Sequence, residues 1–107
     1  MYVADNGNGR VVVFDRQGNA QRSFAVPGLE SQPFSEPQME FDGKGRLWIT
    51  VPLQHEVRAY DPRGKMLHAL PIQEAHQALT PLGLAVSRGK LIVTTVEGQL
   101  REVPLPE

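Results

Sequence analysis

The chain has 107 residues, of which 40% are hydrophobic and 21% are charged, and its formal net charge is −1. This length suits one small domain, and the near-neutral balance gives no overall attraction to nucleic acid or to an anionic membrane. The absence of cysteine excludes disulfides and cysteine-ligated metal centres. No apolar stretch approaches the roughly 20 residues that a membrane-spanning helix needs. The sequence therefore predicts a small soluble module without a membrane span, and it leaves the cellular compartment open.

Short segments rich in Val, Ile, Leu and aromatic residues, each bounded by Gly, Pro, Asn or Asp, are typical of β-strands. In chain order they fall into groups of three, four and three: 2–5, 10–15 and 20–25; 37–42, 46–51, 56–61 and 65–70; 82–86, 90–95 and 99–104. Residues 11–14 are apolar at every position, which indicates a strand buried on both faces.

The three groups are copies of one unit. Residues 10–15 (RVVVFD) match 56–61 (EVRAYD), and residues 45–49 (GRLWI) match 89–93 (GKLIV). A period of about 40–50 residues with four strands per unit is the spacing of β-propeller blades. We therefore predict an all-β fold, in which four-stranded antiparallel sheets form blades of an incomplete propeller ring. An ordinary antiparallel sandwich is the alternative.

This interpretation divides the chain into blades and connections. They are a partial blade over 1–25, a linker over 26–36, a full blade over 37–70, a loop over 71–80 and a partial blade over 81–107. Ten strands cannot close a ring of four-stranded blades, and open sheet edges invite association. We expect either a fragment of a larger propeller, completed by missing blades, or a chain that self-associates through its open edges.

Two stretches resemble a known repeat family. Residues 2–15 (YVADNGNGRVVVFD) resemble the NHL repeat, in which an aspartate ends one strand and an asparagine and an arginine open the next. Residues 41–50 (FDGKGRLWIT) resemble the first half of such a repeat, and the third copy keeps only the strand pattern. The resemblance implies about two and a half blades of an NHL-type β-propeller. It also implies, as a parent, a long membrane-anchored bacterial protein with extracytoplasmic repeats.

In this register, the loops between second and third strands and the loops between blades open on one face. The polar residues of these loops form the candidate ligand-binding set: Asn6, Asn8, Arg10, Gln54, His55, His76 and Glu97. The alternative for each is structural; Asp5 and Arg10, for example, can form an ion pair that staples their loop. The spacing of the histidines matches no compact metal motif, although folding could pair His55 with His76. We expect no catalytic residue, no metal site and no cofactor.

Aspartates precede three of the predicted turns. Asp15, Asp42 and Asp61 are expected to cap these turns by accepting backbone N–H bonds, whereas a calcium site would need several such oxygens to converge. The linker, with Glu30 and Glu36, is long enough to be functional.

The partner class follows from the charges of the predicted binding face. This face leans acidic and has Arg10 as its lone basic loop residue, which disfavours nucleic acid. The leading hypothesis is a non-catalytic scaffold that presents its loops to a protein, peptide or glycan. One alternative is a fragment of a gluconolactonase-like, metal-dependent hydrolase, for which the inner strands offer only Gln38, Glu40 and Asp42. The other is a structural spacer that completes a ring.

Overall fold

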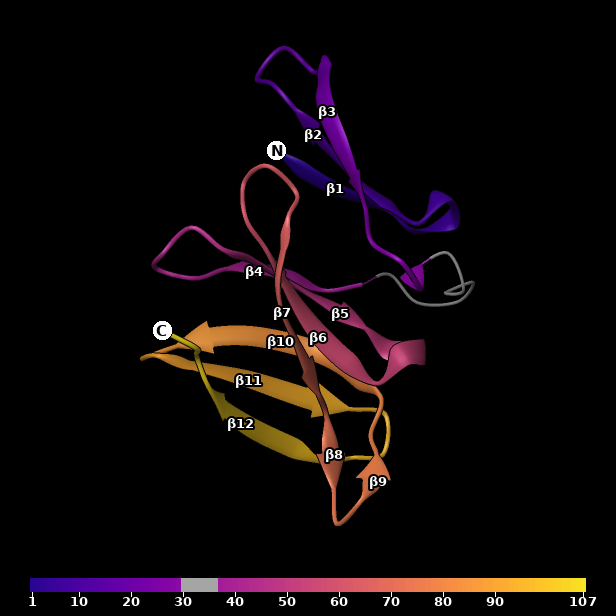
Figure 1. Cartoon of the computed structure of the whole chain (residues 1–107), viewed down its shortest axis with the longest axis vertical. Helices are drawn as coiled ribbons and strands as arrows, with labels where there is room; N and C mark the ends of the chain where they lie inside the picture. Colours follow the sequence, from indigo (N-terminus) through magenta and orange to yellow (C-terminus); the bar gives the residue numbers. More distant parts are fainter. Residues whose placement is uncertain (30–36) are drawn as a thin grey trace.

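A computed structural model describes residues 1–29 and 37–107, and ten of its strands form three antiparallel sheets that follow one another along the long axis (Figure 1). The first sheet contains β1 (Tyr2–Asp5), β2 (Arg10–Phe14) and β3 (Ala20–Ala25). The second contains β4 (Met39–Phe41), β5 (Leu47–Val51), β6 (Glu56–Tyr60) and β7 (Met66–Pro71). The third contains β10 (Pro81–Ser87), β11 (Lys90–Thr95) and β12 (Leu100–Pro104). The predicted grouping of the strands and the incomplete ring are confirmed.

The connection between the second and third sheets is more ordered than a loop. Residues 71–80 contain a hairpin of β8 (Gln73–Glu74) and β9 (Gln77–Ala78). Its two turn residues, Ala75 and His76, have φ values of 49° and 67°, the sign that a two-residue type I′ hairpin turn requires. Two short 3₁₀ turns, η1 (Asn6–Asn8) and η3 (Pro52–Gln54), complete the elements of the described residues. Within the described residues, no helix is long and apolar enough to cross a bilayer.

The central strand β5 holds the three sheets together because it is buried on both faces. One face of β5 joins a core shared with the first sheet: Val11, Val13, Phe24, Val26, Leu29, Leu47, Ile49, Val51 and Tyr60. The other face contributes Trp48 to a core shared with the third sheet: Val57, Ala59, Ile72, Leu79, Leu91 and Val93. Successive side chains of a strand point to opposite faces, so one strand can seal two neighbouring sheets. This is the packing predicted for stacked propeller blades.

Three turns on the side opposite to η1 and η3 share one design, Asp-x-x-Gly-x. In each, the carboxylate accepts backbone N–H bonds of 2.9–3.0 Å from the second and fourth residues after it. The glycines have φ values between 79° and 89°, which residues with a side chain rarely adopt. The carboxylates that cap these turns are those of Asp15, Asp42 and Asp61. The sequence-based prediction of turn capping is therefore confirmed.

Asp42 does more than cap its turn. Its second carboxylate oxygen accepts a bond of 2.6 Å from Arg46 Nε and a bond of 2.9 Å from Trp48 Nε1. Burial acts to raise the pKa of Asp42, but the bonds from Trp48, Arg46 and the backbone outweigh it and lower the pKa to about 2. One buried carboxylate therefore fixes the β4–β5 turn and the ring of the core tryptophan together.

We expect Asp42→Asn to destabilise the chain at neutral pH and to remove the part of its acid sensitivity that comes from this carboxylate. The folded pKa of about 2 lies below the ordinary aspartate value of 3.8, so the ionised carboxylate stabilises the fold above about pH 4. That contribution, about 2 kcal/mol, is lost as the pH falls toward 2. The measurement is the free energy of unfolding in urea, followed by circular dichroism at several pH values between 7 and 2.

Asp61→Asn is the matched control because Asp61 caps an equivalent turn. In the described residues it has neither the arginine nor the indole partner of Asp42, so its substitution should cost less. Equal losses of stability in the two variants would contradict the role assigned to Asp42.

Candidate binding face

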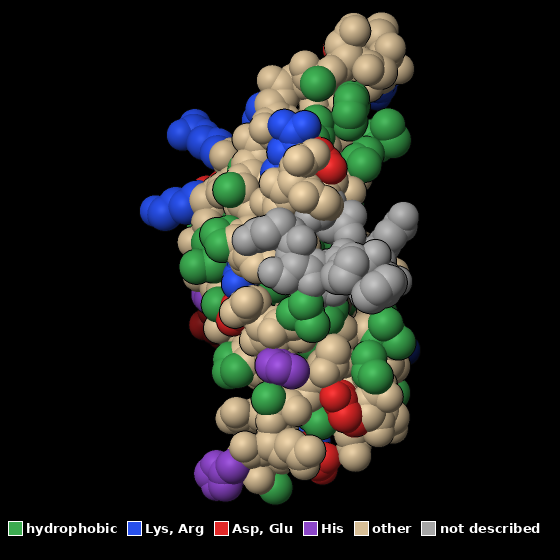
Figure 2. Space-filling model, turned by 90° about the vertical axis from the view of Figure 1, so that its right-hand side faces the viewer, with side chains coloured by type: hydrophobic (Ala, Val, Ile, Leu, Met, Phe, Trp, Pro, Cys, Tyr) green, Lys and Arg blue, Asp and Glu red, His purple; other side chains and the backbone are tan. Residues whose placement is uncertain are grey.

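Three of the loops in the predicted binding face lie on one side of the molecule, and the β8–β9 hairpin projects away from them. The β1–β2, β5–β6 and β11–β12 connections are at the right of Figure 1, whereas the β4–β5 and β10–β11 turns are at the left. Figure 2 looks onto the loop side: hydrophobic, acidic and histidine side chains are interspersed over its lower half, and most basic side chains lie in its upper half. This face is therefore chemically mixed.

The β1–β2 loop is closed by a small polar cluster. Arg10 Nε donates to Asp5 Oδ2 at 2.9 Å, and Asn8 Nδ2 donates to the same carboxylate at 3.0 and 3.2 Å. The bond from Asn8, followed by that from Arg10, lowers the pKa of Asp5. The Arg10 side chain nevertheless stays 48% exposed, and only its Nε is engaged by Asp5. The structure thus brings Asn8 and Arg10 together through Asp5, and Asn6 lies in the same turn, η1.

His55 holds the equivalent loop of the second blade to the blade-connecting segment. It has φ 57°, and it occupies the position where the first blade has Gly9, with φ 64°. Its Nδ1 lies 3.1 Å from the Leu79 carbonyl oxygen, so Nδ1 carries the proton. Its backbone carbonyl also accepts a bond of 2.9 Å from Ile72 N. His55 is thus an inter-blade tether whose Nε2 makes no hydrogen bond to the part of the chain that the structure describes.

Gln54 packs against the chain that leaves the first blade. A side chain at Gly28 would place its Cβ only 2.7 Å from Gln54 Cγ, so the glycine, with φ 95°, allows this close approach. Gln54 remains an exposed residue, although its amide group also lies against Gly28.

Glu97 and His76 lie in different environments. Glu97 accepts bonds from the backbone N (2.8 Å) and hydroxyl (2.9 Å) of Thr80, and the backbone bond is the main cause of its lowered pKa. His76 is exposed at the tip of the β8–β9 hairpin. The base of this hairpin is anchored in the core by Ile72 and Leu79, the residue whose carbonyl binds His55.

Two apolar residues at the loop tips were absent from the sequence-based set. Leu53 is 51% exposed in η3, and Val96 is 64% exposed in the β11–β12 turn. Both lie between the second and third strands of their blades, in consecutive copies of the repeat. The sequence does show an apolar residue at corresponding loop positions of two repeats. This pattern could have identified them, because a residue at a loop tip is not expected to be buried in the core.

The described residues contain no group of three or more His, Asp or Glu side chains that could hold a metal ion. Among the inner-strand residues considered for a hydrolase, Asp42 is engaged by Arg46 and Trp48. Glu40 lies on β4, and Gln38 precedes it. Residues 30–36, which include Glu30 and Glu36 of the linker predicted to be functional, lie outside the described part of the chain.

The fold and its neighbours define the class: this chain is a set of consecutive β-propeller blades. No protein-family model matches the sequence, and no curated protein is matched by it. Among solved structures, virginiamycin B lyase from Staphylococcus aureus is similar over 99% of this chain, with a TM-score of 0.65 and 16% identity. A streptogramin B lyase is similar over 99% of this chain, with a TM-score of 0.63 and 17% identity. A protein of unknown function from Bacteroides caccae is similar over 89% of this chain, with a TM-score of 0.55 and 16% identity. The chain spans only 37–38% of the length of these structures.

The left-handed backbone of His55 leads to a prediction about stability. His55→Ala loses the bond to the Leu79 carbonyl and keeps the unfavourable φ, so we expect a loss of about 1 kcal/mol. His55→Gly loses the same bond but relieves the backbone strain, which is itself about 1–2 kcal/mol, so its stability should stay close to that of the parent chain. Urea unfolding of the two variants measures the difference, and a glycine variant weaker than the alanine variant would contradict this account.

Proposed function

We propose that this chain is part of a non-catalytic, NHL-like propeller whose loop face binds a protein or peptide. The observation that supports the proposal is that two loops carry an exposed apolar residue at the tip and are also held in place by hydrogen bonds to another segment. Leu53 and Val96 are exposed on loops whose neighbouring residues, His55 and Glu97, are bonded to the segment that joins two blades. Binding surfaces are commonly formed by loops positioned by a rigid scaffold.

The chemistry of the face favours a protein or peptide over a glycan. Exposed aliphatic side chains gain free energy when a partner removes them from water, and polar groups around them supply orientation. On this face, the Arg10 donors not bonded to Asp5 and the His55 Nε2 have no hydrogen-bond partner within the described residues, and Gln54 is exposed, so these groups could orient a partner. Nucleic acid stays disfavoured because the loops of this face provide few basic side chains.

A peptide-display selection against the chain tests this proposal. Leu53→Ser, Val96→Ser and Arg10→Ala should each weaken the binding of the selected peptides. The loss should be about tenfold in affinity for the one of these residues that the peptide buries most completely. Leu67→Ser is the matched control because Leu67 is an exposed leucine on the outer strand β7. Circular dichroism establishes that each variant folds.

Two outcomes would contradict the proposal. Peptides that bind all four variants equally would place the interaction elsewhere, for example on the open edges of β1 or β12. A selection that yields no binder would favour the alternative of a structural spacer that completes a larger ring.

As a second candidate, this chain is part of a larger propeller that is an enzyme. It is favoured by the similarity to two lyase structures, of which this chain covers somewhat more than a third. In that case the reactive groups would come largely from other blades. The gluconolactonase-like form of this candidate, in which Gln38 and Glu40 contribute to a metal site, has a direct test.

We expect Ca²⁺, Zn²⁺ and Mn²⁺ to leave the melting temperature of the chain unchanged. A metal bound by the folded state stabilises it by an amount that grows with the logarithm of its concentration over Kd. A thermal-shift titration with each ion measures this effect. A saturable rise that is abolished by Glu40→Gln, but not by the control Glu102→Gln on β12, would favour the hydrolase candidate instead.

A further inference from the structure

The third blade differs from the other two at its outer edge. β2, β6 and β12 are corresponding strands of the repeat. On its outer side, β2 is paired with β3, and β6 is paired with β7. Within the described residues, the outer side of β12 has no paired strand (Figure 1). Such an edge presents backbone N–H and C=O groups to which a further strand can bind.

The backbone groups on this edge can be assigned from the ladder. Leu105 N donates to Gly89 O at 2.9 Å, so every second residue counted back from Leu105 is in a hydrogen-bonded pair with β11. Hydrogen-bonded and non-hydrogen-bonded pairs alternate in an antiparallel ladder. The N–H and C=O groups of Leu100 and Glu102 therefore point away from β11, toward the open side.

A residue with left-handed backbone sets the same register in all three blades. Gly9, His55 and Gly98 precede the corresponding strands and have φ values of 64°, 57° and 85°. In the first two blades, the carbonyl of this residue accepts a bond from the outer strand's side, at 2.8 Å from Val26 N and at 2.9 Å from Ile72 N. The Gly98 carbonyl is the corresponding acceptor, and no backbone donor of residues 1–29 or 37–107 bonds to it.

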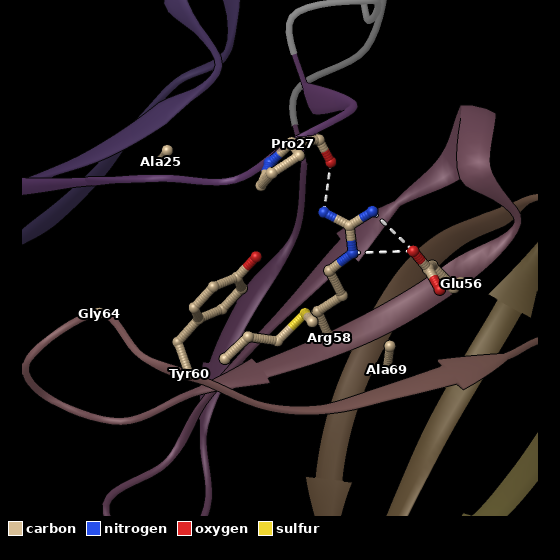
Figure 3. Close-up of a pocket in the computed structure, with 8 residues that line it drawn as sticks. Ala25, Pro27, Glu56, Arg58, Tyr60, Gly64 and Ala69 are labelled. Carbon is tan, nitrogen blue, oxygen red and sulfur yellow. Dashed lines mark hydrogen bonds and ion pairs between the residues drawn. The ribbon is translucent and has the colours of Figure 1, made fainter.

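The second blade shows how an outer strand surrounds this position. Figure 3 shows Arg58 of β6 and Ala69 of β7 beside a cavity of about 310 Å³ between the first and second sheets. Arg58 Nη1 donates to the carbonyl of Pro27, in the segment that leaves the first blade, and its side chain is 9% exposed. Arg101 of β12 corresponds to Arg58 and lies 3.6 Å from Glu74, in the next such segment, but its side chain is 38% exposed. The arginine is thus more exposed in the blade without an outer strand.

The outer strands of the other two blades share a side-chain pattern. Residues 22–26 (RSFAV) and 68–72 (HALPI) both read basic, small, apolar, any residue, apolar. In both, the first apolar residue is opposite the strand position that Leu100 occupies in β12, and the basic residue is opposite the position of Glu102. Leu100 is 61% exposed, so an apolar residue across from it removes both from water. A basic residue across from Glu102 forms a favourable cross-strand pair.

The charges of β12 favour such a peptide over a second copy of the same strand. Antiparallel pairing of two β12 strands places Glu102 opposite Glu102, or Arg101 opposite Arg101, in the two central registers. Like charges directly opposite each other destabilise a strand pair. Pro104, which has no N–H group, removes one donor from the end of the edge.

We propose that the outer edge of β12 binds an extended peptide segment of a partner protein as an antiparallel fourth strand, with the pattern basic, small, apolar, any residue, apolar. The backbone groups of Gly98, Leu100 and Glu102 bind the peptide backbone, and the last two side chains select the apolar and the basic residue. This mode of recognition is strand addition to a sheet edge. It uses neither Leu53 nor Arg10, so the inference does not rest on the proposed function.

The test uses a capped peptide with the sequence of residues 20–26 (AQRSFAV), the outer strand of the first blade. It is titrated into the ¹⁵N-labelled chain, and the hydrogen exchange of single amides is followed by NMR. The edge amides of Leu100 and Glu102 should shift and exchange about tenfold more slowly at saturation. The amides of Arg101 and Val103, which are bonded to β11, serve as the internal reference.

Two N-methylated peptides separate strand addition from side-chain contact. A methyl group on the phenylalanine nitrogen removes a donor that this register directs at the Leu100 carbonyl, so binding should weaken about tenfold. A methyl group on the nitrogen of the following alanine, which points away from β12, is the matched control and should change the affinity little. Glu102→Lys should weaken the parent peptide about threefold and favour a peptide in which glutamate replaces the arginine.

The proposal is overturned if the amides of Leu100 and Glu102 gain no protection, or if the two N-methylated peptides bind equally well. Protection in the free chain that rises with chain concentration also overturns it, because a second copy then occupies the edge. Leu53→Ser and Arg10→Ala should leave the binding of this peptide unchanged. A loss of binding in either variant would place the peptide on the loop face instead.

Discussion

The structure depends on strand β5 being sealed on both faces. Leu47, Ile49 and Val51 face the first sheet, and Trp48 faces the third, so each outer sheet depends on the central one for its core. A sheet of three or four strands cannot bury its own apolar faces, and propeller blades solve this by stacking. The outer faces of the first and third sheets have no described neighbour, and apolar residues such as Val3 and Leu100 are exposed. These faces are where further blades, or a second copy, would add.

Most of the hydrogen-bonded polar side chains described above stabilise turns and loops. The Asp-x-x-Gly-x turns set the hairpins on one side of the blades, and Asp42 also fixes the core tryptophan. On the loop side, Asp5 closes its own loop, whereas His55 and Glu97 tie their loops to the segment that joins two blades. Because these side chains are engaged, the groups left for a partner are few: the outer donors of Arg10, one nitrogen of His55, and the apolar tips.

The fold was largely predictable because its information is local and repeated. Ten strands, their three-four-three grouping and the incomplete ring follow from short apolar segments and from turn residues that recur at one spacing. The β8–β9 hairpin was missed because its turn is formed by Ala75 and His76, neither of which is a typical residue for positive φ. The bonding partners of the candidate loop residues, such as Thr80 for Glu97 and Leu79 for His55, could not be predicted because they belong to another connection.

By itself, the sequence determined the blades, the turns between their strands and the aspartates that cap those turns. Each of these rests on residues within one repeat, whose spacing and backbone preferences can be read along the chain. The tertiary structure alone decided what happens between repeats. Arg58 and Tyr60 belong to one blade, but the pocket that they line exists only because β3 and Pro27 of the preceding blade form its other wall. Packing between distant segments sets which polar atoms are paired, and no local pattern encodes that choice.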